Sequence, residues 1–339
     1  MLASDSRLVA VIIPCFRVRQ HILDVLSKIG EGVDAIYVVD DKCPEGTGTL
    51  VHEQCTDPRV RVIFHDSNQG VGGAVMTGIT IAIKDGMEIV VKLDGDGQMD
   101  PALLPRFLGP IHAEQADFAK GNRFFNPDDV RAMPLGRLVG NAALSFFAKL
   151  SSGYWNVFDP TNGFIAADAR LMAALPFDKI SKRYFFESDL LFRVGLARAK
   201  VIDIPIVAHY GAERSNLKIH RELPQFFWLN LRNAVKRIFY NYFLRDFNIA
   251  SLELVFGLML TAFGSIYGLA NMGGEVAAPP GVVMLAAFPL LTGIMLLLSF
   301  INFDAQQVPR EPISFGLGNG NSPRRRKWRA RTARSTEAG

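Results

Sequence analysis

The sequence predicts an α/β domain that is followed by interfacial helices and a two-helix transmembrane hairpin. Short apolar runs alternate with segments of helical spacing in the N-terminal part of the 339-residue chain. This alternation is typical of a parallel sheet. Two long uncharged segments follow, each longer than the roughly 20 residues that a helix needs to cross a bilayer. Arginines and lysines flank both segments.

Apolar, β-branched runs bounded by turn residues indicate buried strands. We expect strands at residues 8–14, 35–39, 59–65, 89–93 and 201–207, and helices at 21–29 and 72–83. In such a sheet ligands bind where the strands end. Polar side chains directly after these strands are therefore the candidate site.

Two carboxylates follow the fourth strand directly. Asp94 and Asp96 are two residues apart, and Gln98 offers a third oxygen at the same spacing. Such a pair can share one hard divalent cation, which serves mainly to bind phosphates. An EF-hand would need glycine and glutamate where Met99 and Pro105 stand. The sequence therefore predicts a metal–diphosphate site, with a solvated acidic turn as the alternative.

Other nucleotide motifs fit less well. The run Gly70-Val71-Gly72-Gly73 lacks the last glycine of a dinucleotide fingerprint, because Val75 stands there. No P-loop motif occurs in the sequence. The pair Asp40-Asp41 ends the second expected strand and can bond a base and a ribose hydroxyl, with loop capping as the alternative.

Composition indicates an ordered protein, with 49% apolar and 21% charged residues. The three cysteines have no metal-binding spacing, and the chain starts without a cleavable signal pattern. Both features favour a reducing, cytosolic environment.

The uncharged segments span residues 254–274 and 276–303, with Pro279-Pro280 in the turn between them. Basic residues precede the first segment and follow the second, whereas the connecting loop holds only Glu275. The positive-inside rule then places both termini and the N-terminal domain in the cytosol. We expect the basic tail to be largely disordered and to bind anionic headgroups, with nucleic-acid binding as the weaker alternative.

A helix precedes the first span. Apolar side chains recur at three- or four-residue spacing, with cations between them: Phe227, Leu231, Val235, Ile238 and Tyr242, alternating with Arg232, Lys236 and Arg237. This pattern favours a helix lying along the bilayer surface. A helix packed on the soluble domain is the alternative. The expected organisation is thus a cytosolic α/β domain over 1–220, interfacial helices over 221–250, a transmembrane hairpin over 251–303 and a basic tail over 304–339.

Several motifs, taken in order, resemble those of family 2 glycosyltransferases with a GT-A fold. They are Ile13-Pro14-Cys15-Phe16, Val39-Asp40-Asp41 with Pro44-Glu45-Gly46-Thr47, Asn68-Gln69-Gly70 and Asp94-Gly95-Asp96-Gly97-Gln98. Three later motifs resemble the acceptor half of the dolichyl-phosphate mannose synthase and polyprenyl-phosphate glucosyltransferase group. They are Gly121-Asn122-Arg123, Asp159-Pro160-Thr161-Asn162-Gly163-Phe164 and Phe186-Glu187-Ser188-Asp189. The resemblance covers roughly residues 8–220.

The resemblance implies a role for each matching position. The nucleotide-sugar residues would be Pro14, Phe16, Asp40, Asp41, Asn68, Gly70 and Asp94, with Asp40 at the nucleoside. Asp94, Asp96 and Gln98 would coordinate Mg²⁺ or Mn²⁺ bridging the diphosphate. Arg123 and Arg137 would face the lipid phosphate, while Asn141 stands where the family often has a serine. Asp159, Glu187 and Asp189 would line the sugar and acceptor site and complete the catalytic set.

Two further cations lie before the interfacial helix. Arg214 and Lys218 are placed to guide the lipid phosphate inward, with ordinary headgroup contacts as the alternative. His209 stands alone beside Tyr210, so we expect a structural role for it and not metal binding.

Together these features predict an inverting, metal-dependent transfer of a hexose from UDP-glucose or GDP-mannose to undecaprenyl or dolichyl phosphate. A processive polysaccharide synthase would need more spans and a Q-x-x-R-W motif, where this chain has Gln225-Phe226-Phe227-Trp228. A membrane-anchored adaptor without activity and a sugar-nucleotide hydrolase are further alternatives. The sequence does not distinguish the base or the sugar, and it leaves a homo-oligomer open.

Overall fold

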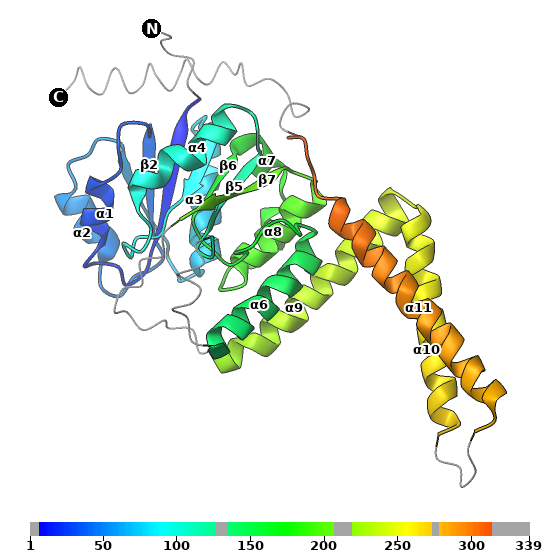
Figure 1. The fold of residues 1–339 in the computed structure, drawn as a ribbon. Coiled ribbons are helices and arrows are strands. Elements are labelled where there is room, and N and C mark those ends of the chain that lie inside the picture. Colours follow the sequence, from blue (N-terminus) through cyan, green and yellow to red (C-terminus); the bar gives the residue numbers. More distant parts are fainter. Residues whose placement is uncertain (1–6, 126–134, 207–218, 273–277, 314–339) are drawn as a thin grey trace. The chain divides into compact units, whose positions relative to one another are not determined.

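The structure is a computed structural model that describes residues 7–125, 135–206, 219–272 and 278–313 (Figure 1). The chain divides into two compact units. The first comprises residues 1–233 with those from 309 onward, and the second residues 234–308.

A seven-stranded mixed sheet forms the centre of the first unit. Its strands are β1 (Val9–Cys15), β2 (Ala35–Asp40), β3 (Val60–Phe64), β4 (Ile89–Lys92), β5 (Phe118–Asn122), β6 (Ile165–Asp168) and β7 (Val201–Pro205), in the order β3-β2-β1-β4-β6-β5-β7. β6 runs antiparallel to both β4 and β5, whereas the other pairs are parallel. The expectation of a parallel sheet is therefore wrong for β6, because residue composition does not record the direction in which a strand enters the sheet.

Helices cover both faces of this sheet (Figure 1). They are α1 (Ile22–Ser27), α2 (Thr47–Gln54), α3 (Val71–Lys84), α4 (Leu104–His112), α7 (Ala169–Ala174) and α8 (Phe186–Leu196), with short 3-10 turns at Pro101–Leu103 and Phe177–Lys179. A further helix, α6 (Leu135–Ser152), packs against α8. Alternation along β1 separates the two layers. Val11 and Ile13 join the core with α1 and α4, whereas Ile12 faces α3, where a Cβ on Gly78 would lie 2.5 Å from it.

The strand order reverses beside β1. β2 and β3 extend to one side of β1, and β4 lies on the other. In open α/β sheets the crevice at such a reversal, outside the carboxyl ends of the strands, is where ligands bind. Asp40 at the end of β2 and Asp94 after β4 flank this point.

α9 (Ile219–Phe239) buries two asparagines and exposes several apolar side chains. Within the first unit, Asn230 contacts Ser151 of α6 at 2.8 Å, and Asn233 donates to Asp189 of α8 at 2.9 Å. Trp228 and Val235 are instead 66% and 60% exposed. The part of α9 that belongs to the first unit therefore packs on α6 and α8 through polar contacts that the apolar spacing did not reveal, and its position along the bilayer surface stays a prediction.

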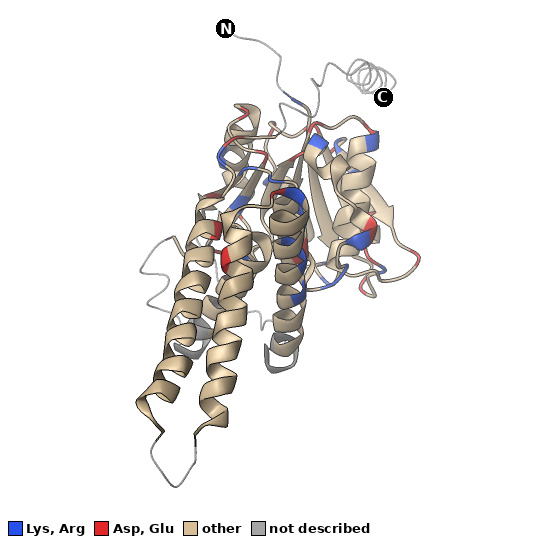
Figure 2. Cartoon of the chain, turned by 90° about the vertical axis from the view of Figure 1, so that its right-hand side faces the viewer, with Lys and Arg blue, Asp and Glu red and all other residues tan. Residues whose placement is uncertain are grey.

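The second unit is a pair of long apolar helices, α10 (Ile249–Ala270) and α11 (Pro280–Gln306), preceded by a π-helical turn at Tyr240–Arg245. Both helices are long and apolar enough to cross a bilayer. Figure 2 shows them almost without charge, and only Glu253 and Asp304 carry one. Glycines let their backbones approach, since a Cβ on Gly264 would lie 2.6 Å from Ala286 O.

A buried ion pair closes one end of this hairpin. The Arg237 guanidinium binds the Asp304 carboxylate through two hydrogen bonds of 2.7 and 2.8 Å, and Tyr242 Oη donates to the same carboxylate. Arg237 is only 2% exposed. This cation, predicted to be one of several at the membrane surface, is therefore a structural part of the second unit.

Candidate donor and acceptor site

The two aspartates at the end of β2 hold backbone N–H groups. The Asp40 carboxylate accepts from Cys43 N at 2.7 Å and from Gly48 N at 2.6 Å, so it fixes the turn before α2. Asp41 accepts from Gln69 N at 2.8 Å and Gly70 N at 2.7 Å, and it also pairs with His65. Asp41 thereby fixes the loop that begins α3.

The Asn68-Gln69-Gly70 loop lies directly against Asp41. Asn68 Nδ2 donates to the Asp41 carbonyl at 3.1 Å. Gly70 has a φ of +85°, and a Cβ there would meet the Lys182 carbonyl. Only glycine combines this backbone conformation with such a close approach. Asp41, Asn68 and Gly70, which the resemblance assigns to the nucleotide sugar, therefore come together.

Pro14 and Phe16 lie at the end of β1, beside β2. Pro14 is opposite Val39 in the sheet register, and Phe16 is 43% exposed. The residue after Phe16, Arg17, has a φ of +60°, so the chain turns sharply there. Phe16 thus presents an aromatic ring next to the turn that follows Asp40-Asp41.

Asp94 is bound to a buried lysine. Lys92, the last residue of β4, contacts Asp94 at 2.8 Å and Glu187 of α8 at 3.3 Å. Burial alone would lower the pKa of Lys92, but the charges of Asp94 and Glu187 outweigh burial and raise it. The lysine therefore joins the fourth-strand motif to the first turn of α8.

Gly163 allows the backbone of the acceptor-half motif to approach Lys92 and Asp94 closely. A Cβ on Gly163 would overlap Lys92 Nζ and would lie 2.9 Å from Asp94 Oδ2. Any other residue would occupy the space beside the Asp94 carboxylate. The fourth-strand motif and the later glycine motif thus share one cluster.

The metal ligands expected from the sequence lie in one loop. Asp96 is half-buried and accepts from Gln98 N at 3.0 Å, and the Gln98 side chain is exposed. Among the described residues no group of three or more His, Cys, Asp or Glu side chains could hold an ion. Two carboxylates suit Mg²⁺ or Mn²⁺ when substrate phosphates supply further ligands. The residues present therefore fit a metal that binds together with a diphosphate.

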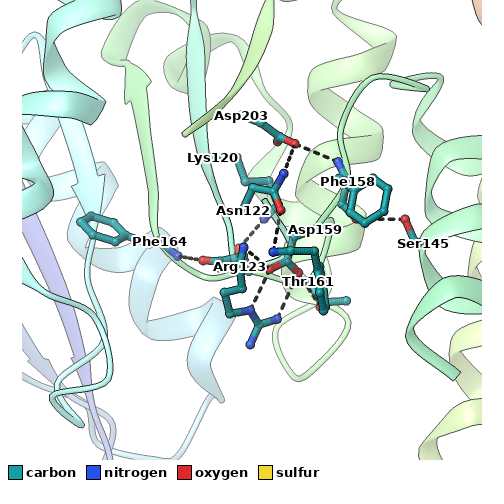
Figure 3. Close-up of polar contacts among 11 residues, drawn as sticks. Lys120, Asn122, Arg123, Ser145, Phe158, Asp159, Thr161, Phe164 and Asp203 are labelled. Carbon is teal, nitrogen blue, oxygen red and sulfur yellow. Dashed lines mark hydrogen bonds and ion pairs between the residues drawn. The ribbon is translucent and has the colours of Figure 1, made fainter. Parts of the chain in front are cut away.

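Arg123 and Asp159 form a two-pronged ion pair (Figure 3). Arg123 Nε and Nη2 donate to the two Asp159 oxygens at 2.7 and 3.0 Å, and Asp159 is fully buried. Burial alone would raise the pKa of Asp159, but the hydrogen bonds and charge of Arg123 lower it. Planar pairing of this kind fixes a guanidinium in orientation as well as in position.

A second buried lysine lies beside this pair. Lys120 of β5 donates to the Asn162 carbonyl, and burial lowers its pKa to about 8. Lys92 and Lys120 are both opposite Ile165 in the sheet register, so they flank it on one rung. Neither lysine was predicted to belong to the site. The signal that could have indicated both is a lysine within an otherwise apolar strand.

Asp189 lies in the first turn of α8 with Glu187, but its surroundings differ. It is 1% exposed, and its oxygens accept from Ser181 N at 2.8 Å and from Asn233 Nδ2 at 2.9 Å. Asp189 therefore holds α9 and the loop before α8, whereas Glu187 contacts Lys92.

Some expected residues cannot be compared with the structure. The side chains of Arg137 and Asn141, both in α6, lie outside the described residues, and so do Arg214, Lys218 and His209. Sequence reasoning also missed Asp203 of β7, which contacts Asn122 and Phe158 (Figure 3).

Comparison with known proteins gives a consistent result. The family model described as glycosyl transferase family 2 matches residues 10–174. The undecaprenyl-phosphate mannosyltransferase of Micrococcus luteus is 30% identical over 202 residues, which are 58% of this chain and 82% of that protein. The polyprenol monophosphomannose synthase of Mycolicibacterium smegmatis is 30% identical over 201 residues, 58% of this chain and 75% of that one. The UDP-N-acetylglucosamine–dolichyl-phosphate N-acetylglucosaminyltransferase of Methanococcus voltae is 29% identical over 219 residues, 60% of this chain and 87% of that one.

Solved structures share the fold. Mannosyl-3-phosphoglycerate synthase from Rubrobacter xylanophilus superposes with a TM-score of 0.52 at 19% identity, over 71% of this chain and 77% of that one. Glucosyl-3-phosphoglycerate synthase from Mycobacterium tuberculosis, in complex with Mn²⁺, UDP and phosphoglyceric acid, gives 0.51 at 20% identity, over 68% and 78%. These likenesses confirm the predicted GT-A fold. With the two relatives at 30% identity, the chain belongs to glycosyltransferase family 2, in the dolichyl-phosphate mannose synthase and polyprenyl-phosphate glucosyltransferase group.

Proposed function

We propose that this glycosyltransferase moves a hexose from UDP-glucose or GDP-mannose to a polyprenyl phosphate, with inversion, in a metal-dependent reaction at the cytosolic membrane face. The relatives from Micrococcus luteus and Mycolicibacterium smegmatis are named for sugar transfer to polyprenyl lipids, and they support the acceptor class. The contact between Lys92, Asp94 and Glu187 carries the proposal, because it brings the donor motif against the acceptor half.

Asp94 and Asp96, with Gln98, would hold Mg²⁺ or Mn²⁺ at the donor diphosphate. Bound there, the metal would act as a Lewis acid that stabilises the negative charge of the departing diphosphate. The close approach of Gly163 keeps a side chain out of the space beside Asp94. Asp41 orders the Asn68–Gly70 loop through backbone N–H groups, and Phe16 offers a ring to the nucleoside.

The acceptor side needs positioning more than it needs a base. A lipid phosphate is largely anionic near neutral pH because its second pKa is about 6. Its oxygen forms a bond to the anomeric carbon while the bond to the diphosphate breaks, and no proton has to be removed. Arg123, oriented by Asp159, would hold this phosphate, together with Arg137 by resemblance. The hydrogen bonds that Asp189 accepts favour a structural role for it.

Direct displacement inverts the anomeric centre, so an α-linked donor gives a β-linked lipid product. Arg214 and Lys218 remain candidates for guiding the phosphate inward. Glu187, held by Lys92, would face the transferred sugar.

The membrane segments bring the enzyme to its acceptor. A polyprenyl chain does not leave the bilayer readily, since each buried methylene contributes about 0.8 kcal/mol. We propose that α10 and α11 span the bilayer, with the catalytic domain and both termini in the cytosol, because basic residues flank the pair and the loop between them lacks any.

Aromatic side chains on α6 and α9 support a position at the membrane surface. Edge-to-face contacts join Phe147 of α6 to Phe227 of α9 at 4.8 Å, and Phe227 to Trp228 at 5.7 Å. Phe146, Phe227 and Trp228 are all exposed. Aromatic residues are enriched at headgroup level, where one side of the ring is apolar and the other is hydrated.

Membranes containing the protein test this proposal when they are incubated with radiolabelled UDP-glucose, GDP-mannose or UDP-N-acetylglucosamine and then extracted for lipid. We expect one donor to label a polyprenyl-phosphate sugar of β configuration, and EDTA to abolish labelling until Mn²⁺ or Mg²⁺ is restored. Sugar release without labelled lipid would indicate a hydrolase instead. An α-linked product would exclude single displacement, and full activity in EDTA would exclude the metal.

A further inference from the structure

Asp203 of β7 joins two backbone segments of the acceptor side (Figure 3). One oxygen, Oδ2, accepts from Asn122 Nδ2 at 3.1 Å and from Phe158 N at 2.9 Å. Asn122 immediately precedes Arg123, and Phe158 immediately precedes Asp159. A single oxygen atom thus connects the residue before each partner of the Arg123–Asp159 ion pair.

Both segments are also fixed on their other side. Asn122 Oδ1 accepts from Phe124 N at 2.9 Å, which closes the turn around Arg123. Ser145 Oγ of α6 donates to the Phe158 carbonyl at 3.0 Å. The side chain of Asn122 and the main chain at Phe158 therefore have few alternative positions while Asp203 is present.

The negative charge of Asp203 is not what these contacts use. Its second oxygen, Oδ1, is buried and accepts no hydrogen bond from the described residues. Burial raises the pKa of Asp203, although the nearby Lys120 and the Phe158 N–H oppose that rise. An uncharged amide oxygen of the same shape could still accept from both donors.

We propose that Asp203 is a positioning residue for the lipid-phosphate site, which sets the geometry of the Arg123–Asp159 pair by holding Asn122 and Phe158 with one oxygen. The inference rests on the proposed function, because it assumes that Arg123 binds the acceptor phosphate. The edge strand β7 thereby has a role in acceptor recognition, although Asp203 lies outside the sequence motifs that contain Arg123 and Asp159.

Two substitutions separate the oxygen from the charge. Asp203→Leu removes both acceptors, and we expect the KM for polyprenyl phosphate to rise about 10- to 100-fold, the effect of misplacing a binding group by about 1 Å. Asp203→Asn keeps an oxygen in place, and we expect a much smaller rise in the same KM. Affinity for UDP with Mn²⁺, measured by calorimetry, should be unchanged in both variants.

Asp24→Leu is the matched control. Asp24 is exposed on α1, and its carboxylate pairs with Lys28 directly after the same helix. We expect wild-type KM, UDP affinity and melting temperature for this variant.

A double substitution tests whether Asp203 acts through Arg123. Residues that act through one another are not additive, so Asp203→Leu should raise the lipid KM little further in an Arg123→Ala background. Full additivity would overturn the inference. So would an unchanged lipid KM in a folded Asp203→Leu variant, or an Asp203→Asn variant as impaired as Asp203→Leu.

Loss of UDP affinity in step with lipid KM would also overturn it, because general damage to the domain would then explain the effect. Failure of the proposed function has a different signature. In that case the wild-type protein itself labels no lipid with any donor, and the inference falls with it. Normal wild-type transfer with an unaffected Asp203→Leu variant rejects the inference alone.

Discussion

β4 and β5 each bury a lysine, and the charges of the two lysines are compensated in different ways. Lys92 on β4 contacts two carboxylates, those of Asp94 and Glu187, and its pKa is raised. Lys120 on β5 donates to the Asn162 carbonyl, and its pKa falls to about 8 because burial dominates. The donor side is therefore charge-compensated by direct ion pairs, whereas the acceptor side keeps a lysine that is readily neutralised.

This difference predicts how much stability the chain loses when each lysine is replaced. Breaking a buried ion pair by removing one partner leaves an uncompensated charge and costs about 3–5 kcal/mol. Lys120 has a carbonyl as its hydrogen-bond partner among the described residues, so its removal takes away a charge that burial disfavours together with one hydrogen bond.

Asp94→Asn should have the largest effect on turnover. The substitution removes a proposed metal ligand and one of the two carboxylates beside Lys92. We expect kcat to fall about 10³-fold or more, since metal stabilisation of the leaving group contributes several kcal/mol. Steady-state transfer to lipid and calorimetric titration of UDP with Mn²⁺ measure it.

Asp100→Asn is the control for this change in the same loop. Asp100 is exposed and caps the short Pro101–Leu103 turn through Ala102 N. The Asp100→Asn substitution should change the free energy of unfolding slightly and leave kcat unchanged. A wild-type kcat in the Asp94→Asn variant would contradict the proposed role of Asp94 as a metal ligand at the donor diphosphate.

Lys92→Met should have the largest effect on stability. Without the lysine, Asp94 and Glu187 lie close together with no cation between them. We expect the free energy of unfolding to fall by about 3 kcal/mol, measured by urea denaturation. Adding Glu187→Gln should recover part of this loss, because it removes one of the two negative charges. An equal loss in the single and double variants would show that packing, and not charge, is what Lys92 contributes.

Asp189→Asn should have a smaller effect on catalysis than Asp94→Asn. Both are carboxylates of the predicted site, but Asp189 accepts hydrogen bonds from Ser181 N and Asn233. If no base is needed, kcat should fall less than about 10-fold, with a loss of stability of about 1–3 kcal/mol for the disturbed buried contacts. An Asp189→Asn variant as inactive as Asp94→Asn, with UDP affinity intact, would contradict the base-free mechanism.

Much of the donor side could be predicted because it is local in sequence. The strands β1 to β4 end within a residue or two of their expected positions, since β-branched runs mark them, and Asp94, Asp96 and Gln98 lie in one loop. β5 and β6, on the acceptor side, were not predicted. The short helix α2 was not predicted, because its eight residues have only weak apolar spacing.

The acceptor side depends on contacts between distant residues, which a single sequence does not record. Arg123 and Asp159 were both expected at the site, but their pairing spans 36 residues. Asp203 pairs with Asn122 across 81 residues. The polar contacts of α9 were not predicted because Asn230 and Asn233 are buried between apolar residues of which several, such as Trp228 and Val235, are exposed.

The pH dependence of stability gives the smallest and most specific test of the two lysines. The pKa of Lys120 is about 8 in the folded chain against an ordinary value of 10.5. Between these values the unfolded chain binds more protons at this site, so Lys120 makes stability rise with pH across this window and fall as pH drops through 8. Lys120→Met should remove that contribution, so the difference in unfolding free energy between wild type and variant should change between pH 8 and 10.5. Urea denaturation at several pH values measures this difference. Lys92 has a raised pKa, so Lys92→Met should show no rise of this kind. Identical pH profiles for the two variants would contradict the contrast between the two lysines.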